Sequence, residues 1–138
     1  MKNTTRNYLM MGLVIVAVLG LSVFNRSRSH SLAAGLPDDS VIGKGKPVVI
    51  QFGAHWCPPC RKQLPVMIEL AKEQTAFQTA FLDVDEHPQT ARDNNIGPIP
   101  TLIFFDGDGN ELDRHTGFYP KDSILTKWKE LGVDATSL

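Results

Sequence analysis

Cys57 and Cys60, in the sequence Trp56-Cys57-Pro58-Pro59-Cys60, are the side chains of this chain best suited to chemistry. They are the only cysteines among the 138 residues, which excludes a scaffold of several disulfides and a zinc site of four cysteines. A thiolate attacks disulfides, and a second thiol one helical turn away can release the product by closing an internal disulfide. We therefore expect thiol:disulfide exchange, with Cys57 as the nucleophile and Cys60 as the resolving residue.

Two other interpretations of the pair stay open at this point. The cysteines could be an inert buried pair, or they could supply half of the ligands of a shared metal site. His55 lies beside the motif and can polarise Cys57 or bind a metal, but an exposed loop histidine without a role fits equally well. We do not include His55 among the catalytic residues.

A second polar group follows later in the chain and consists of Asp83, Asp85, Glu86 and His87. Strand alternation would splay these side chains to opposite faces, as at a solvated strand end. We predict no metal site, and no cofactor beyond the redox-active disulfide Cys57-Cys60.

The cysteine motif falls between an expected strand, residues 48–52, and an expected helix, residues 58–74. The strand is a β-branched run that ends at a glycine, which is typical of a strand buried on both faces. Pro59 suits a first helical turn, and Pro65 falls inside the helix. The positive end of the helix dipole would then point at the first sulfur and stabilise a thiolate there.

The rest of the chain continues the alternation of strands and helices. Apolar spacing and turn residues predict a strand at 77–84, a helix at 87–95, a strand at 101–105, a turn at 106–110, an edge strand at 111–116 and a helix at 121–131. The order βαβαββα predicts an α/β fold, with a central mixed sheet covered by helices on both faces.

Ile99-Pro100 directly precedes the third strand. Taken alone, Pro100 is better interpreted as an ordinary trans residue that starts a strand, because only ~5–6% of such bonds in folded proteins are cis. A cis bond would expose the neighbouring backbone groups for pairing with an extended peptide. Trp56 would pack beside the sulfurs and shape the substrate surface, and Pro58 and Pro59 would restrain the turn.

These motifs together resemble the thioredoxin superfamily over nearly everything from Pro47 to Gly132. PVVIQFGAHWCPPC is similar to the family's first strand and active-site turn, and GPIPTLIFF is similar to its cis-proline strand. The resemblance implies a thioredoxin-like fold in which Pro100 is cis and faces Cys57. Substrate contacts are then expected at Trp56, Pro58, Pro59, Ile99 and Pro100.

The resemblance extends to exported, membrane-linked members of the superfamily. TLIFFDGDGNEL followed by HTGF resembles the carboxy-terminal domain of DsbD, and the apolar amino terminus with WCPPC resembles the TlpA and cytochrome c maturation thioredoxins. This implies a protein-disulfide reductase that takes electrons from a membrane thiol donor. Its substrates would be exported proteins with disulfides or thiols, apocytochrome c among them, and the alternatives are an oxidase, an isomerase or a non-catalytic binding module.

Two positions depart from the pattern of the family. Its usual buried acid beneath the resolving cysteine falls at Gln51, and the lysine that often pairs with this acid falls at Phe81. An amide can form hydrogen bonds but cannot accept the proton of Cys60, so we expect slower resolution.

The amino terminus carries 17 uncharged residues, Tyr8 to Phe24, after Lys2 and Arg6. Their length favours a membrane anchor, residues 1–25, over a cleaved signal peptide. Residues 26–46 have the composition of a flexible tether, and 47–138 would form the domain on the periplasmic side of the cell membrane. The 14 basic and 15 acidic residues nearly balance, which argues against nucleic acid as a partner.

Overall fold

The computed structural model describes residues 36–135. The elements, in chain order, are the 3-10 helix η1 (Asp39–Val41), β1 (Val48–Gly53), α2 (Pro58–Glu73), β2 (Gln78–Asp83), α3 (Pro88–Asp93), β3 (Thr101–Phe105), β4 (Glu111–Thr116) and α4 (Lys121–Glu130). After η1 this is the predicted order βαβαββα. β3 and β4 have the predicted bounds, and the other predicted elements differ by one or two residues at an end.

The four strands form one mixed sheet in the order β2-β1-β3-β4. β1 runs parallel to β2 and antiparallel to β3, and β3 forms an antiparallel pair with β4. β1 lies inside the sheet with all of its residues buried, as its β-branched run predicted. β4 is an edge strand and is largely exposed, which agrees with its polar sequence.

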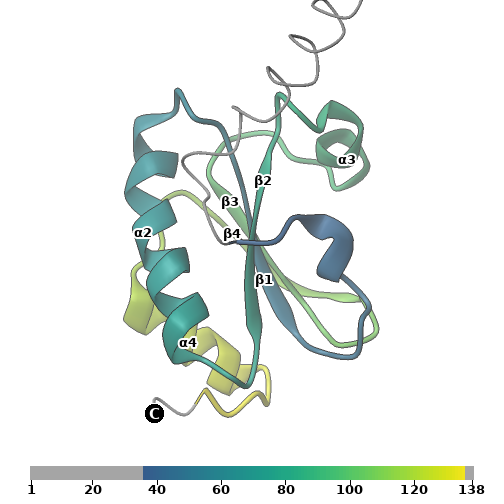
Figure 1. Ribbon diagram of the computed structural model, residues 1–138, viewed down its shortest axis with the longest axis vertical. Coiled ribbons are helices and arrows are strands. Elements are labelled where there is room, and N and C mark those ends of the chain that lie inside the picture. Colours follow the sequence, from purple (N-terminus) through teal and green to yellow (C-terminus); the bar gives the residue numbers. More distant parts are fainter. Residues whose placement is uncertain (1–35, 136–138) are drawn as a thin grey trace, which may run out of the picture. The chain divides into compact units, whose positions relative to one another are not determined.

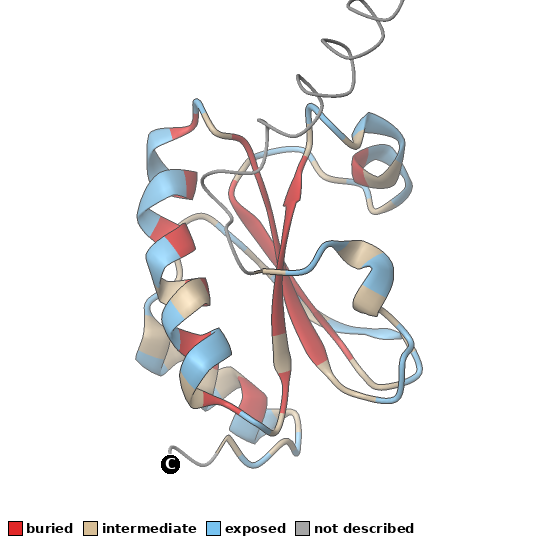
Figure 2. Ribbon diagram, viewed as in Figure 1, coloured by how far each residue is buried: buried red, intermediate tan, exposed pale blue. Residues whose placement is uncertain are grey.

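Helices cover both faces of the sheet, with α2 and α4 on one face and η1 and α3 on the other (Figure 1). Figure 2 shows the buried residues concentrated in the strands between these layers. Strand alternation divides the core into two apolar clusters. One cluster includes Val49, Leu102, Phe104, Met67 and Trp128, and the other includes Ile50, Phe52, Leu82, Ile103 and Phe105.

α2 positions the cysteine motif against the sheet. Its buried apolar residues Leu64, Met67 and Leu70 are three positions apart and lie on one side of the helix. Pro58 and Pro59 occupy its first turn, where a missing backbone N–H leaves no helical hydrogen bond unmade. Pro65 lies inside the helix, as predicted.

The sequence predicts a flexible tether over residues 26–46. The described part of this segment, residues 36–46, is packed onto the domain instead. Pro37 O accepts a hydrogen bond of 3.0 Å from the Phe81 N–H, and the Gly45 N–H donates one of 2.8 Å to Gly107 O. Val41 and Ile42 pack against the second apolar cluster. A few apolar residues and backbone hydrogen bonds fix this segment despite its polar composition.

Within residues 36–135, no helix is both long enough and apolar enough to cross a membrane. The anchor expected over residues 1–25 lies outside the described residues, as does the part of the tether that precedes residue 36.

Candidate active site at Cys57 and Cys60

Cys57 and Cys60 are joined by a disulfide at the start of α2, with their Cα atoms 5.2 Å apart. The short turn between β1 and α2 is closed by a hydrogen bond of 3.2 Å from the Cys57 N–H to Ala54 O. Cys57 is the N-cap of α2, and its sulfur accepts the Cys60 N–H over 3.3 Å. The first sulfur therefore lies at the amino end of a 16-residue helix, where the helix dipole and the Cys60 N–H favour negative charge.

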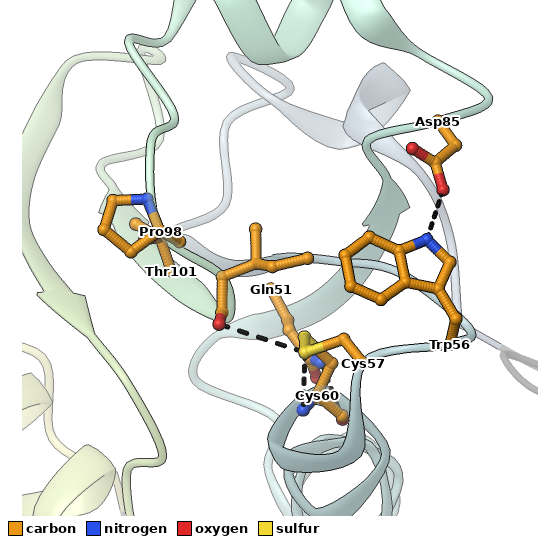
Figure 3. Close-up of a disulfide and its surroundings, with 8 residues drawn as sticks. Gln51, Trp56, Cys57, Cys60, Asp85, Pro98 and Thr101 are labelled. Carbon is orange, nitrogen blue, oxygen red and sulfur yellow. Dashed lines mark hydrogen bonds between the residues drawn. A yellow bond between two sulfur atoms is a disulfide. The ribbon is translucent and has the colours of Figure 1, made fainter.

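Ile99 and Pro100 lie next to this disulfide, although they are about forty residues away in the chain. The peptide bond between them is cis, as the family resemblance implied. The backbone oxygen of Ile99 lies 3.9 Å from Cys57 Sγ, a contact drawn as a dashed line in Figure 3. Thr101 Oγ1 donates a hydrogen bond of 2.7 Å to Pro98 O and holds the bend that precedes β3.

Trp56 is the most exposed large apolar residue of the described chain, with 67% of its surface accessible. Its indole N–H donates a hydrogen bond of 2.6 Å to Asp85 Oδ2, and Figure 3 shows the ring extending beside the disulfide. Pro58 and Pro59 are also exposed. The disulfide is therefore bordered by the indole ring and two proline rings that solvent can reach.

Gln51 lies under the motif, fully buried, on the sheet face that packs against α2. Its side-chain amide donates a hydrogen bond of 2.9 Å to the backbone oxygen of Cys60, and its own Oε1 has no hydrogen-bond partner within the described chain. Phe81 is its neighbour on β2. The positions of the family's acid and lysine are thus occupied by an amide and a phenyl ring.

The side chains of His55 and Asp83 are in contact at the end of the sheet, with 3.4 Å between His55 Nε2 and Asp83 Oδ2. Asp83, the last residue of β2, is buried, and Asp85, in the turn that follows, is exposed. Among residues 36–135 no three histidines, cysteines or acids are grouped closely enough to hold a metal ion. Asp83 and Asp85 instead contact the turn that carries His55 and Trp56.

Asp85 is a site residue whose contact with Trp56 the sequence alone does not indicate. Its sequence context indicates a solvated strand end, but its carboxylate fixes the indole of Trp56. The available signal is its position just beyond a buried strand that pairs with β1, since parallel strands end at the same edge of the sheet.

Known proteins resemble this chain over the same region. The family model described as Thioredoxin matches residues 37–130. The thioredoxin of Mycobacterium tuberculosis is 40% identical over 92 residues, which cover 66% of this chain and 78% of that protein. The chloroplastic M-type thioredoxin of Pisum sativum is 41% identical over 91 residues, 65% of this chain and 52% of that protein.

Solved structures agree with these sequence matches. A mutant thioredoxin from Halobacterium salinarum superposes with a TM-score of 0.61 at 32% identity, covering 67% of this chain and 80% of that one. The thioredoxin of Fasciola hepatica gives a TM-score of 0.58 at 33% identity, covering 64% and 83%. The chain therefore belongs to the thioredoxin family and is a thiol:disulfide oxidoreductase, with the Cys57–Cys60 disulfide as its redox-active centre.

Proposed function

We propose that this oxidoreductase reduces disulfides of exported proteins, with Cys57 as the attacking nucleophile and Cys60 as the resolving residue. The observation that carries the assignment of roles is the position of the Cys57 sulfur. It lies at the N-cap of α2, 3.9 Å from Ile99 O, and Trp56 is exposed beside it. In the reduced state the helix end favours the thiolate at Cys57 rather than at Cys60, which lies inside the first turn.

The exchange proceeds in two steps. The Cys57 thiolate attacks one sulfur of the substrate disulfide, the substrate S–S bond breaks, and the released substrate thiolate takes a proton. Cys60 then loses its proton and attacks Cys57 Sγ, which breaks the mixed disulfide and releases the second substrate thiol. Two electrons have passed to the substrate, and the Cys57–Cys60 disulfide must be reduced again by a thiol donor.

The surface around Cys57 supports a polypeptide substrate. Trp56, Pro58 and Pro59 offer exposed apolar area, and Ile99 and Pro100 bring backbone next to the sulfur. An extended chain laid across these residues would place its disulfide beside Cys57. We assign substrate contacts to these five residues.

The cellular setting is proposed from the sequence. The uncharged segment 8–24 would serve as a single membrane anchor and place the domain on the periplasmic side. A membrane thiol protein would supply the electrons, and apocytochrome c is one class of substrate. This proposal follows the resemblance to DsbD, TlpA and cytochrome c maturation thioredoxins, whereas the relatives named above are thioredoxins without a stated membrane role.

Trapping with Cys60→Ser tests the roles of the cysteines. Without Cys60 the second step stops, so partners should stay bound to Cys57 and be released by dithiothreitol. The double variant Cys57→Ser/Cys60→Ser is the matched control and should trap none. Partners retained equally by both variants would show a binding module without exchange chemistry and would overturn the proposal.

The direction of electron flow is tested by equilibrating the full chain against a glutathione or dithiothreitol series. A reduction potential near the ~−270 mV of thioredoxin supports the reductase, whereas one near the ~−120 mV of DsbA would make the protein an oxidase. Protease digestion of intact spheroplasts tests the location, because a periplasmic domain is digested and a cytoplasmic one is protected.

A further inference from the structure

Gln63 is a fully buried glutamine in α2, three residues after Cys60. Both polar atoms of its side chain are bonded to the backbone of one distant residue. Nε2 donates a hydrogen bond of 3.0 Å to Tyr119 O, and Oε1 accepts one of 2.7 Å from the Tyr119 N–H. The side chain thus pairs with Tyr119 through two hydrogen bonds, across 56 positions of sequence.

Tyr119 belongs to the connection between β4 and α4, residues 117–120, which we call the β4–α4 loop. At its other end, the Gly117 N–H donates a hydrogen bond of 2.8 Å to Pro100 O. Pro100 directly follows Ile99, whose oxygen lies 3.9 Å from Cys57 Sγ. The β4–α4 loop is therefore fastened at one end to the segment that faces the nucleophile and at the other end to the helix that carries it.

Phe118 stands between these two attachments. It is half-buried, and the ammonium group of Lys62 lies 4.5 Å from the centre of its ring, so the ring lies against the first turns of α2. Tyr119 itself is stacked on His115 at 3.9 Å between ring centres. The loop therefore presents a partly exposed aromatic ring next to the helix that carries the redox pair.

We propose that Gln63 is a positioning residue for polypeptide substrates, which holds the β4–α4 loop so that Gly117 and Phe118 form one wall of the surface beside Cys57. This rests on the proposed function, since it requires that the substrate is a protein disulfide. Small disulfides need only the sulfur of Cys57 and do not touch this wall. Gln63 therefore affects recognition of a protein substrate and leaves the exchange chemistry unchanged.

The test compares two substrates on the full chain. Gln63→Met keeps the length of the side chain but removes the amide that bonds Tyr119. We expect KM for a disulfide-bonded protein, insulin, to rise roughly tenfold, toward the lower end of what the loss of both hydrogen bonds to Tyr119 can cost. The kcat for insulin, and both constants for oxidised glutathione, should stay within about twofold. Gln63→Glu retains the oxygen that accepts the Tyr119 N–H and should give an intermediate KM, a partial rescue.

Gln74→Met is the matched control. Gln74 is a buried glutamine at the other end of α2, and its side-chain nitrogen and oxygen have no hydrogen-bond partner within residues 36–135. Its KM for insulin should equal that of the parent. A general structural effect would lower Tm and slow both substrates alike, and that result would overturn the inference, as would an unchanged KM for insulin in Gln63→Met.

The proposed function can fail separately. If the parent chain reduces insulin but Gln63→Met does so with the same KM, the inference on Gln63 alone is overturned. If the parent reduces neither insulin nor oxidised glutathione, the reductase itself is refuted and the role of Gln63 with it.

Discussion

The side-chain amide of Gln51 donates a hydrogen bond of 2.9 Å to the backbone oxygen of Cys60. An amide at this position supports the helix start through this hydrogen bond but cannot act as a base that takes up the thiol proton at neutral pH. In the resolving step, the proton of Cys60 must therefore leave through water, the substrate or another group. This makes resolution the step most open to improvement.

Gln51→Glu should accelerate resolution. The new carboxylate has the size of the amide it replaces and lies next to Cys60, where it can accept the thiol proton. We expect a gain of up to about 10²-fold, at the low end of what a positioned base contributes. Stopped-flow absorbance of the second thiolate, released after the reduced protein reacts with Ellman's reagent, measures this step. No change in its rate would show that Cys60 already has an efficient proton acceptor.

The same variant should acquire a new pH dependence of stability. Burial raises the pKa of the introduced carboxyl above the ~4.3 of an unfolded glutamate. Between these two pKa values the folded state binds more protons than the unfolded state. The free energy of unfolding of the variant, relative to the parent, therefore falls by about 1.4 kcal/mol for each unit by which the pH rises. Urea unfolding at several pH values measures this effect. Gln74→Glu is the control, which should show the loss of stability without faster resolution.

Gly53→Ala should disturb the packing of the redox pair. A methyl group at Gly53 would lie 3.2 Å from Cys60 Cβ, 3.3 Å from Cys60 Sγ and 3.1 Å from Gln51 Nε2. Overpacking of this kind costs about 1–3 kcal/mol. Chemical denaturation of the oxidised protein measures the loss. Gly97→Ala is the control because its added methyl meets no atom within 4 Å, and equal effects of the two variants would contradict the prediction.

Asp85→Ala should release Trp56 from its fixed position. The indole N–H loses a charge-assisted hydrogen bond of 2.6 Å, and the ring gains freedom on the surface. Acrylamide quenching of fluorescence reports on Trp56 alone, because Trp56 is 67% exposed and Trp128 is fully buried. We expect stronger quenching and a higher KM for a protein disulfide. Asp93→Ala removes an exposed acid elsewhere and should leave quenching unchanged.

Asp106 should contribute stability that disappears in acid. Hydrogen bonds from the side chain and backbone of Asn110 lower the pKa of the Asp106 carboxyl. A folded pKa below the unfolded value of ~3.9 means that this contribution is complete above about pH 4 and is lost as pH falls through the folded pKa. Asp106→Ala should therefore be less stable than the parent at neutral pH and approach it in acid. Asp108→Ala in the same turn is the control. Asp108 binds the Asp106 carboxylate through its backbone N–H, which the substitution keeps, so the difference in stability between this variant and the parent should not shrink in acid.

The sequence predicted the elements well because their signals are local. The turn residues Asp106 to Asn110 and the change from apolar to polar strands indicated the bounds of β3 and β4. The redox pair Cys57 and Cys60 could be predicted equally well, since the spacing of the two cysteines and their place before a helix are both local properties of the sequence. The cis bond before Pro100 followed only from the family resemblance.

Contacts between distant segments were not predictable in the same way. The hydrogen bond between Trp56 and Asp85 joins residues 29 positions apart, and those between Gln63 and Tyr119 join residues 56 positions apart. No sequence pattern around the aspartate or the glutamine indicates which distant residue it will bind. The packing of residues 36–46 was missed for a related reason. Its hydrogen bonds are made by backbone atoms, which every residue carries.

That packed segment has a consequence for the outer edge of the sheet. β2 is an edge strand, and the Phe81 N–H on its open side is occupied by Pro37 O. The opposite edge, β4, is protected differently, by charged side chains such as Glu111 and Arg114. A chain cut at Pro47 would lose Pro37 and leave the Phe81 N–H free to pair with other molecules. We therefore expect residues 36–46 to protect this edge against aggregation.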